Sequence, residues 1–344
     1  MASRSRLPFS SSVTVVLDHP DGRVVVEDVG RGRKRVSVEL FEPSTFMPSS
    51  SAETDYSIEL IEQILAFRGP ARLCYSILRA EDPSHLAEPL RLYILGYLDE
   101  REFEGKRLLD FGCGSGASTV ALASLFPRTE IIAVDLVEGN IPVARARARH
   151  YGVSNATFLV SPGPTDLPAQ IGVFDFIFFS AVYEHLLPEE RRALMPKLWR
   201  SLRSDGVLFL NQTPHRYYPL EYHTTGLPLL NYLPSSLAFW LSRRFSKRIA
   251  MSSSWDELLR GGVRGGTERE ILKDLRAAGE GIPQLLEVNR LGFSDSVDVW
   301  YSLSMARRPL KIKAVMRVVF KATSRVTRST FMPDLNLAIK KSGL

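Results

Sequence analysis

The feature that most constrains the fold is a glycine-rich stretch, Leu-Leu-Asp-Phe-Gly-Cys-Gly-Ser-Gly-Ala-Ser-Thr, at residues 108–119. Asp110 follows two leucines, and Gly112, Gly114 and Gly116 then stand at alternate positions before a helix-forming segment. Glycine is used where the backbone must adopt positive φ or approach a ligand without a Cβ in between. Three glycines between a buried strand and a helix N-terminus predict a loop that lies along a small ligand. This arrangement indicates an α/β fold.

A second short apolar segment, Glu-Ile-Ile-Ala-Val-Asp at 130–135, ends in Asp135. This carboxylate follows the glycine loop by roughly 20 residues, the separation expected when one strand–helix unit divides two neighbouring strand ends. At the tip of a strand it can accept hydrogen bonds from both hydroxyls of a ribose. Asp135 therefore predicts a nucleoside-containing ligand, and its alternative use is as a helix N-cap for 138–151.

A third segment, at residues 173–186, begins as a continuous apolar run and becomes polar at Ser180, Glu184 and His185. Such a run is typical of a strand buried on both faces, as in a parallel sheet. A further apolar strand is expected at 207–213. Ligands of open α/β sheets lie beyond the carboxyl ends of the strands, so these polar residues are candidates for a binding site.

The pattern acid-x-Gly-x-Gly-x-Gly, with Phe-Asp-Phe-Ile and Glu-His-Leu in the third segment, resembles class I S-adenosylmethionine-dependent methyltransferases of the small-molecule type. The resemblance implies a seven-stranded, mostly parallel, Rossmann-like sheet and S-adenosylmethionine as cofactor. Relatives often carry an acid that meets the adenine where Gly163 stands here, so the backbone around Gly163 and Pro164, or Asp166, would take that role. The implied cofactor-binding residues are Asp110, Gly112, Gly114, Gly116, Asp135, Leu136, Gly163, Asp166 and Ser180.

Two other functions remain as alternatives. The spacing of Gly112, Gly114 and Ala117 also satisfies the dinucleotide fingerprint formally, which would make the protein an NAD-dependent oxidoreductase. Asp110 opposes this, because a carboxylate there would repel a pyrophosphate but suits a ligand that carries an ammonium and a sulfonium. The remaining alternative is a non-catalytic S-adenosylmethionine-binding protein with a regulatory or assembly role.

The segment 214–266 is predicted to be an insertion that binds the methyl acceptor, because it is long, aromatic and begins at the ligand edge of the sheet. It is similar, more weakly, to stretches of bacterial methyltransferases of glycan and lipid biosynthesis. We therefore expect an oxygen of a glycan, glycolipid or lipid precursor as acceptor. Removal of the hydroxyl proton needs a base, and His185, His215 and His223 are the catalytic candidates.

Composition limits the remaining possibilities. The two cysteines, Cys74 and Cys113, do not suggest a disulfide framework and favour a reducing compartment. The sequence has no run of eighteen uncharged apolar residues, and its basic N-terminus lacks the apolar core of a signal peptide. We expect a cytoplasmic protein. Neither zinc-ligand spacing nor a magnesium-type acid cluster occurs, so we expect no metal.

The chain is expected to have four parts. Two strand candidates at 284–290 and 297–305 fit the antiparallel hairpin that closes such a sheet. The parts are a β-hairpin extension with a Ser/Pro-rich link at 1–52, a helical cap at 53–104 with helices at 55–68 and 84–102, the methyltransferase domain at 105–306, and a basic amphipathic segment at 307–344.

Charge is concentrated in that last segment, which carries ten Lys or Arg and one acid, whereas the whole chain has a net charge of +6. Lys313, Arg317 and Lys321 recur at helical spacing, and Ile312 and Val315 occupy another face. A basic helix with an apolar face is typical of binding to an anionic membrane, here the inner face. The segment Leu227–Lys247 is a second candidate. The alternative is that both helices pack on the domain, and nucleic acid is a less favoured partner.

Overall fold

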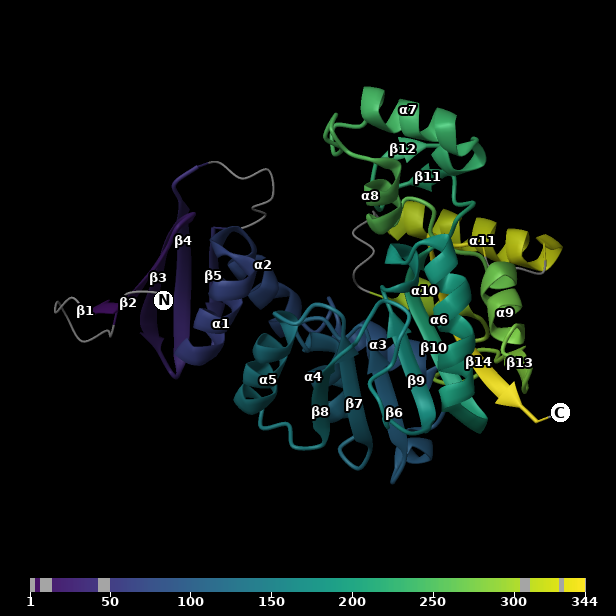
Figure 1. The fold of residues 1–344 in the computed structure, drawn as a ribbon, viewed down its shortest axis with the longest axis horizontal. Coiled ribbons are helices and arrows are strands. Elements are labelled where there is room, and N and C mark those ends of the chain that lie inside the picture. Colours follow the sequence, from purple (N-terminus) through teal and green to yellow (C-terminus); the bar gives the residue numbers. More distant parts are fainter. Residues whose placement is uncertain (1–3, 7–13, 43–49, 304–309, 328–330, 344) are drawn as a thin grey trace.

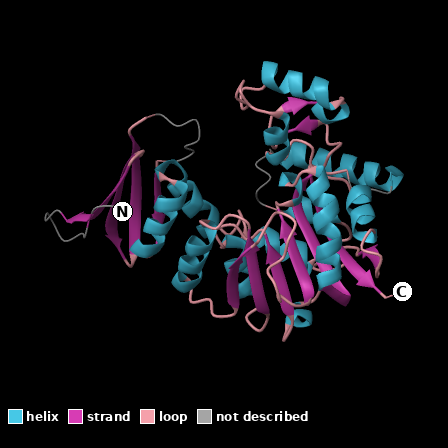
Figure 2. Cartoon of the chain, viewed as in Figure 1, coloured by secondary structure: helices cyan, strands magenta, loops and turns pink. Residues whose placement is uncertain are grey.

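The computed structural model describes residues 4–6, 14–42, 50–303, 310–327 and 331–343. A central α/β domain carries an N-terminal unit on one side and a small lobe above the sheet (Figure 1). The lobe stands over the carboxyl ends of the parallel strands, which Figure 2 shows in magenta. Among the described helices, none is long and apolar enough to cross a membrane.

The central sheet has seven strands in the order β13-β14-β10-β9-β6-β7-β8. The strands β8, β7, β6, β9 and β10 pair in parallel, and β14 is antiparallel to both of its neighbours. The prediction of a seven-stranded, mostly parallel Rossmann-like sheet is therefore confirmed. The strand bounds are β6 Arg107–Phe111, β7 Glu130–Asp135, β8 Ala156–Val160, β9 Phe174–Ser180, β10 Leu202–Pro214, β13 Ile282–Leu285 and β14 Asp334–Ser342.

Both faces of this sheet are buried, which explains the continuous apolar runs of its strands. Consecutive side chains point to opposite faces, so Leu108 and Leu109 enter different cores. Leu109 packs with Trp199 of one helix layer, whereas Leu108 packs with Phe103 and Leu122 of the other. The helices of this domain are α3 Ala87–Leu95, α4 Ala117–Leu125, α5 Asn140–His150, α6 Pro188–Ser201, α9 Glu268–Arg276, α10 Ser296–Ser302 and α11 Leu310–Thr327.

The N-terminal unit is a five-stranded antiparallel sheet in the order β1-β2-β3-β4-β5, covered by α1 and α2. The predicted hairpin and third strand are present as β2, β3 and β4, and β5 follows the expected link, of which residues 43–49 lie outside the described part. Val143 and Ala146 of α5 belong to the same core as this sheet, so the unit packs on the central domain. The bounds are β1 Arg4–Arg6, β2 Thr14–His19, β3 Gly22–Gly30, β4 Arg33–Leu40, β5 Ser51–Thr54, α1 Ile58–Arg68 and α2 Pro70–Glu81.

Two helix predictions before the glycine loop need correction. Helix α2 was not expected, and the helix predicted at 84–102 is shorter, with α3 followed by a separate 3₁₀ turn at Glu100–Phe103. Gly96 ends α3, and the side chain of Asp99 caps the turn by accepting a hydrogen bond from the Arg101 N–H. A glycine and a new N-cap therefore divide what periodicity alone suggested to be one helix.

The predicted closing hairpin was wrong in its second strand. Residues 296–302 form helix α10, because the Asp295 side chain accepts a hydrogen bond from the Asp298 N–H and caps it. The antiparallel strand is instead β14, from the end of the chain. Its alternating residues Leu335, Leu337 and Ile339 enter the core. The segment 307–344 thus holds a basic helix and then a buried strand of the central sheet.

Helix α11 docks on the domain through its basic residues. The Lys313 ammonium donates to the Leu303 carbonyl, and Arg317 and Lys321 form ion pairs with Asp298 at 2.6 and 2.7 Å. The basic face therefore packs inward instead of facing an open surface as predicted. The exposed apolar side chains of this helix are Ile312, Val315, Val318, Val319 and Val326.

The lobe between β10 and α9 corresponds to the predicted insertion at 214–266. His215 and Gly266, at its two ends, form an isolated parallel bridge that closes its base. Its own small core contains Leu230, Ala238 and Leu258. Its elements are β11 Leu220–Glu221, β12 Leu227–Pro228, a 3₁₀ turn at Leu230–Tyr232, α7 Ser235–Phe245 and α8 Trp255–Arg260.

Candidate functional site

The glycine loop connects β6 to α4 at the carboxyl edge of the sheet. At Gly112, where φ is +81°, a Cβ would lie 2.3 Å from Val182 Cγ2, and at Gly116 it would lie 2.8 Å from Ala144 Cβ. Side chains at these two positions would push the loop away from its neighbours. A Cβ on Gly114 would instead meet no atom within 4 Å. The loop therefore presents bare backbone at Gly114 to open space, as a ligand cradle requires.

Asp135 ties this loop to the next one. Its Oδ2 accepts a hydrogen bond from the Gly114 N–H at 2.8 Å, and its Oδ1 accepts from the Val137 N–H and the Asn140 amide, both at 2.9 Å. A carboxylate offers about four acceptor sites, so capacity remains for a ligand hydroxyl. The adjacent Leu136 is 48 % exposed and supplies apolar surface beside it. This geometry fits a nucleoside with its ribose at Asp135.

Asp110 lies beneath the loop. Its Oδ2 accepts hydrogen bonds from Ser118 Oγ at 3.1 Å and Thr119 Oγ1 at 2.7 Å, which fixes the first turn of α4. Burial raises the pKa of Asp110 to about 6, against the effect of these two hydroxyls. The carboxylate is thus part of the loop's support.

The loop after β8 contains two more predicted cofactor contacts, Gly163 and Asp166. Ser161 Oγ donates to both of their carbonyl oxygens, at 2.9 and 2.6 Å, and this closes the loop into a tight turn. The Asp166 carboxylate is paired with Lys197 Nζ at 2.6 Å. The side chain of Asp166 is therefore engaged elsewhere, and the backbone of the turn is the better candidate for contacts to an adenine.

A second polar cluster lies beyond β9, in the 3₁₀ turn Tyr183–His185. Glu184 is fully buried, and its Oε2 accepts a hydrogen bond from Thr213 Oγ1 at 3.2 Å. Its Oε1 lies 3.7 Å from His185 Nε2 and accepts no hydrogen bond from the described residues. Burial raises the pKa of Glu184 to about 8. His223 reaches this cluster from the lobe, with its ring centroid 5.6 Å from that of His185.

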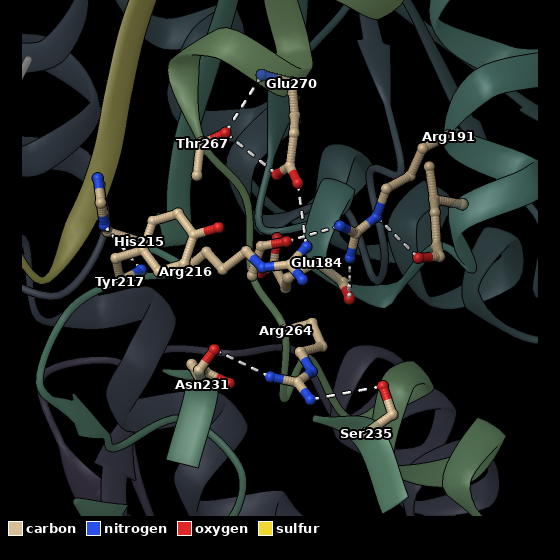
Figure 3. A network of polar contacts seen from close by, with 12 residues as sticks. Glu184, Arg191, His215, Arg216, Tyr217, Asn231, Ser235, Arg264, Thr267 and Glu270 are labelled. Carbon is tan, nitrogen blue, oxygen red and sulfur yellow. Dashed lines mark hydrogen bonds and ion pairs between the residues drawn. The ribbon is translucent and has the colours of Figure 1, made fainter. Parts of the chain in front are cut away.

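A buried arginine fixes the backbone around Glu184. Arg191 of α6 donates to the carbonyl oxygens of Glu184, Leu186 and Gly265, at 3.1, 2.9 and 2.6 Å. Figure 3 shows this guanidinium beside Glu184, with Arg264 below it reaching the lobe at Asn231. Arg191 therefore holds the turn and the base of the lobe as one unit.

Backbone strain and unsatisfied polar groups gather at the same place. Ala181 and Gln212, just beyond β9 and near the end of β10, have φ of 53° and 57°. Asn211 beside them is fully buried, and neither of its amide atoms has a hydrogen-bond partner among the described residues. Ser180, the predicted cofactor contact, lies opposite Asn211 in the strand register. Such features persist mainly where a ligand completes the site.

The structure separates the three predicted histidines. His185 and His223 lie together with Glu184. His215 is buried at the base of the lobe, where its Nδ1 accepts a hydrogen bond from the Tyr217 N–H and its ring packs on Phe331. We therefore take His215 as a structural residue.

Several residues of the site were not predicted. Thr213, Asn211 and Arg191 lie within ordinary strand and helix patterns, so the sequence carries no signal for them. Gly262 is different, because a Cβ there would lie 2.7 Å from His223 Cδ2 and 3.2 Å from Glu184 Cγ. The glycine pair at 261–262 is visible in the sequence, but His223 and Glu184, which lie next to Gly262 in the fold, are distant from it in the sequence.

Residues 108–206 match the family model described as a methyltransferase domain. The chain is 41% identical over 81 residues to the ubiquinone biosynthesis O-methyltransferase of Ruegeria pomeroyi, a match that covers 21% of this chain and 32% of that protein. It is 28% identical over 139 residues to the malonyl-[acyl-carrier protein] O-methyltransferase of Bacillus cytotoxicus, covering 39% and 46%. The chain thus spans less than half the length of these curated relatives.

Among solved structures, an O-methyltransferase family protein from Burkholderia thailandensis superposes with a TM-score of 0.45 at 12% identity. That superposition covers 82% of this chain and 62% of the other.

Proposed function

We propose that the whole protein is an S-adenosylmethionine-dependent methyltransferase that methylates an oxygen of a glycan, glycolipid or lipid precursor, because residues 108–206 match the family model of a methyltransferase domain. The observation that carries this proposal is the contact of two loops at one sheet edge. Val182 packs against Gly112 of the cofactor loop, and two residues later Glu184 begins the cluster with His185 and His223. A methyl donor and a polar acceptor site would therefore be neighbours.

We assign the cofactor to the edge formed by β6, β7 and β8. The ribose hydroxyls would bind at Asp135, the adenine between Leu136 and the backbone turn at Gly163, and the amino-acid part along Gly114. Ser180 would lie at the boundary with the acceptor. S-adenosylmethionine supplies an electrophilic methyl group when bound there, and the residues of the chain hold it in place.

The acceptor oxygen would be held at the cluster, in line with the methyl group. S-adenosylmethionine would supply its methyl group to the lone pair of that oxygen, and the electron pair of the broken C–S bond would stay on its sulfur. The hydroxyl proton leaves through the cluster to solvent, to which His223 is exposed. Glu184 and His185 would position the oxygen on the buried side.

A lipid-linked acceptor is favoured by two apolar surfaces. Helix α11 exposes Val315 and Val318, and α7 exposes Trp240 and Phe245 next to Arg243 and Arg244. Exposed aliphatic and aromatic side chains beside cations suit the interfacial region of a membrane. We therefore propose that the protein acts in the cytoplasm, at the inner face of an anionic membrane.

The test of function is a transfer assay with methyl-labelled S-adenosylmethionine, the purified protein and a lysate of the source cells. We expect label in the organic phase after extraction, because the proposed acceptor carries a lipid. Label only in the aqueous phase would contradict the lipid assignment and leave a free sugar or metabolite. Cofactor binding without any transferred label would favour the non-catalytic alternative.

The membrane proposal has a separate test, which is vesicle flotation. Truncation of 307–344 is unsuitable because it removes β14 from the central sheet. Val315→Asp and Trp240→Asp alter exposed side chains only, so we expect them to abolish flotation with phosphatidylglycerol vesicles while the fold stays intact. Flotation equal to that of the wild type in both variants would refute the anchor.

A further inference from the structure

We propose that Glu184, His185 and His223 form a binding site for a divalent cation of the zinc type. The two imidazoles and one carboxylate come from the turn after β9 and from the lobe, and their ligand atoms all lie within 4.8 Å of one another. Binding of the cation does not depend on the proposed function, but the use of the cation to hold the acceptor oxygen rests on it. The site departs from the expectation of no metal, because His223 reaches the cluster only in the folded chain.

The distance between the ligand atoms of Glu184 and His185 is close to that of a ligated site. Glu184 Oε1 and His185 Nε2 lie 3.7 Å apart. In a tetrahedral site with bonds of about 2.0–2.1 Å, neighbouring ligand atoms are about 3.4 Å apart. The absence of a Cβ at Gly262 allows His223 and Glu184 to lie this close, because a Cβ there would be 2.7 Å from His223 Cδ2 and 3.2 Å from Glu184 Cγ.

His185 is oriented as a metal ligand. Its Nδ1 lies 2.7 Å from the Arg260 carbonyl oxygen, which can only accept, so this nitrogen carries the proton and donates. Nε2 then carries the free lone pair, and it lies 3.7 Å from Glu184 Oε1. A ligating imidazole typically donates its other N–H to a carbonyl or carboxylate in this way.

Glu184 gives the second, independent observation. Its side chain is fully buried, and Oε1 has no hydrogen-bond donor among the described residues. The other oxygen is held by Thr213, which fixes the carboxylate plane. A buried polar oxygen without a partner destabilises the fold, and a cation at this place would remove that cost.

Three protein ligands leave at least one coordination position open. The open side is that of His223, which is exposed, so solvent or an acceptor hydroxyl can reach it. An oxygen bound to such a cation loses its proton more readily. The chemistry therefore matches a hydroxyl acceptor.

The test uses the full-length protein after treatment with a chelator and removal of that chelator. Co²⁺ is titrated in the absence of S-adenosylmethionine, and visible absorption reports tetrahedral coordination, with Zn²⁺ added afterwards as competitor. We expect stoichiometric binding that Zn²⁺ displaces. His223→Ala changes an exposed side chain and should weaken Co²⁺ binding by at least about tenfold, and Glu184→Gln should do the same.

The matched control is His215→Asn, which removes a histidine of the same lobe outside the cluster and should bind Co²⁺ like the wild type. No stoichiometric Co²⁺ binding, or equal binding by the wild type and His223→Ala, would overturn the proposal. Calorimetry of S-adenosylmethionine binding shows that each variant is folded.

The two proposals fail separately. Full methyl transfer by the chelator-treated protein would refute the metal site's part in the reaction and leave the proposed function standing. Stoichiometric Co²⁺ binding that depends on His223, without methyl transfer to any lysate component, would support the metal site and contradict the proposed function.

Discussion

The edge to which we assign the cofactor and the edge to which we assign the acceptor are built in different ways, although they belong to the same sheet. At the proposed cofactor edge, Asp135 accepts a hydrogen bond from the Gly114 N–H of the glycine loop and another from the Val137 N–H of its own loop. At the acceptor edge, Glu184 and Asn211 are buried with polar atoms that lack partners among the described residues, and Ala181 has positive φ. Polar groups at the proposed cofactor edge are therefore largely satisfied within the chain, whereas the proposed acceptor edge keeps buried polar atoms that a ligand could satisfy.

The largest effect is expected from Glu184→Gln, which removes the buried carboxyl group of the proposed acceptor edge. We predict that kcat falls by about 10²-fold, because Glu184 would position the acceptor oxygen, while S-adenosylmethionine affinity stays unchanged. Thr213→Val, which removes only the hydrogen bond to Oε2, should give a smaller loss. Equal losses of kcat and cofactor affinity in Glu184→Gln would contradict the assignment of cofactor binding and acceptor binding to separate edges.

Asp135→Ala is predicted to have the next largest effect, on the opposite edge. It removes a carboxylate that would bind the ribose and that holds the Gly114 N–H, so the Kd for S-adenosylmethionine should rise about 100-fold, or about 2.7 kcal/mol. Calorimetry measures this. Glu130→Gln, at the other end of the same strand and exposed, is the matched control and should bind normally. An unchanged Kd for S-adenosylmethionine in Asp135→Ala would refute our placement of the cofactor at Asp135.

Helix α11 supports the acceptor edge, because its Phe320 packs with Tyr218 at the base of the lobe. Burial opposes ionisation of Asp298, but hydrogen bonds from Lys321, Ser294 and Arg317 outweigh it and lower the pKa of Asp298. Asp298→Asn should destabilise the protein by about 2 kcal/mol at pH 7, as measured by urea unfolding, without changing S-adenosylmethionine affinity.

The pH dependence of the stability difference between the wild type and Asp298→Asn follows from the direction in which folding shifts the pKa of Asp298. A carboxyl whose pKa is lower in the folded state stabilises the protein above its unfolded pKa of about 3.9, and loses this contribution as the pH falls below that value. The stability difference between the wild type and Asp298→Asn should therefore be full at pH 7 and shrink below about pH 4. A difference independent of pH would exclude the ion pairs as its cause.

The smallest effect is expected where the N-terminal unit supports the cofactor edge. Arg68 of α1 donates to Asn140 Oδ1 at 2.8 Å, and Asn140 in turn donates to Asp135. Arg68→Ala should raise the Kd for S-adenosylmethionine about fivefold, equivalent to about 1 kcal/mol. Arg149→Ala breaks an exposed ion pair with Glu59 across the same interface and should leave the Kd unchanged. Identical behaviour of the two variants would show that the N-terminal unit has no specific role.

The two edges also differ in how far the sequence predicts them. The cofactor edge follows from local signals, because the glycines of 108–119 and Asp135 stand directly at strand ends. The acceptor cluster joins His185 to His223 through the fold of the lobe, and no spacing rule contains that contact. In the C-terminal segment the positive charge suggested only a basic amphipathic segment, although Leu335, Leu337 and Ile339 alternate as in a strand and form part of β14. Tertiary pairing, not local propensity, decides such cases.

The most direct test of the account is a calorimetric titration of S-adenosylmethionine into the wild type, Asp135→Ala and Glu184→Gln under identical conditions. We predict that Glu184→Gln binds as tightly as the wild type and that Asp135→Ala binds about 100-fold more weakly. Weak binding by Glu184→Gln together with normal binding by Asp135→Ala would contradict the account, because it would place the cofactor at the other edge of the site.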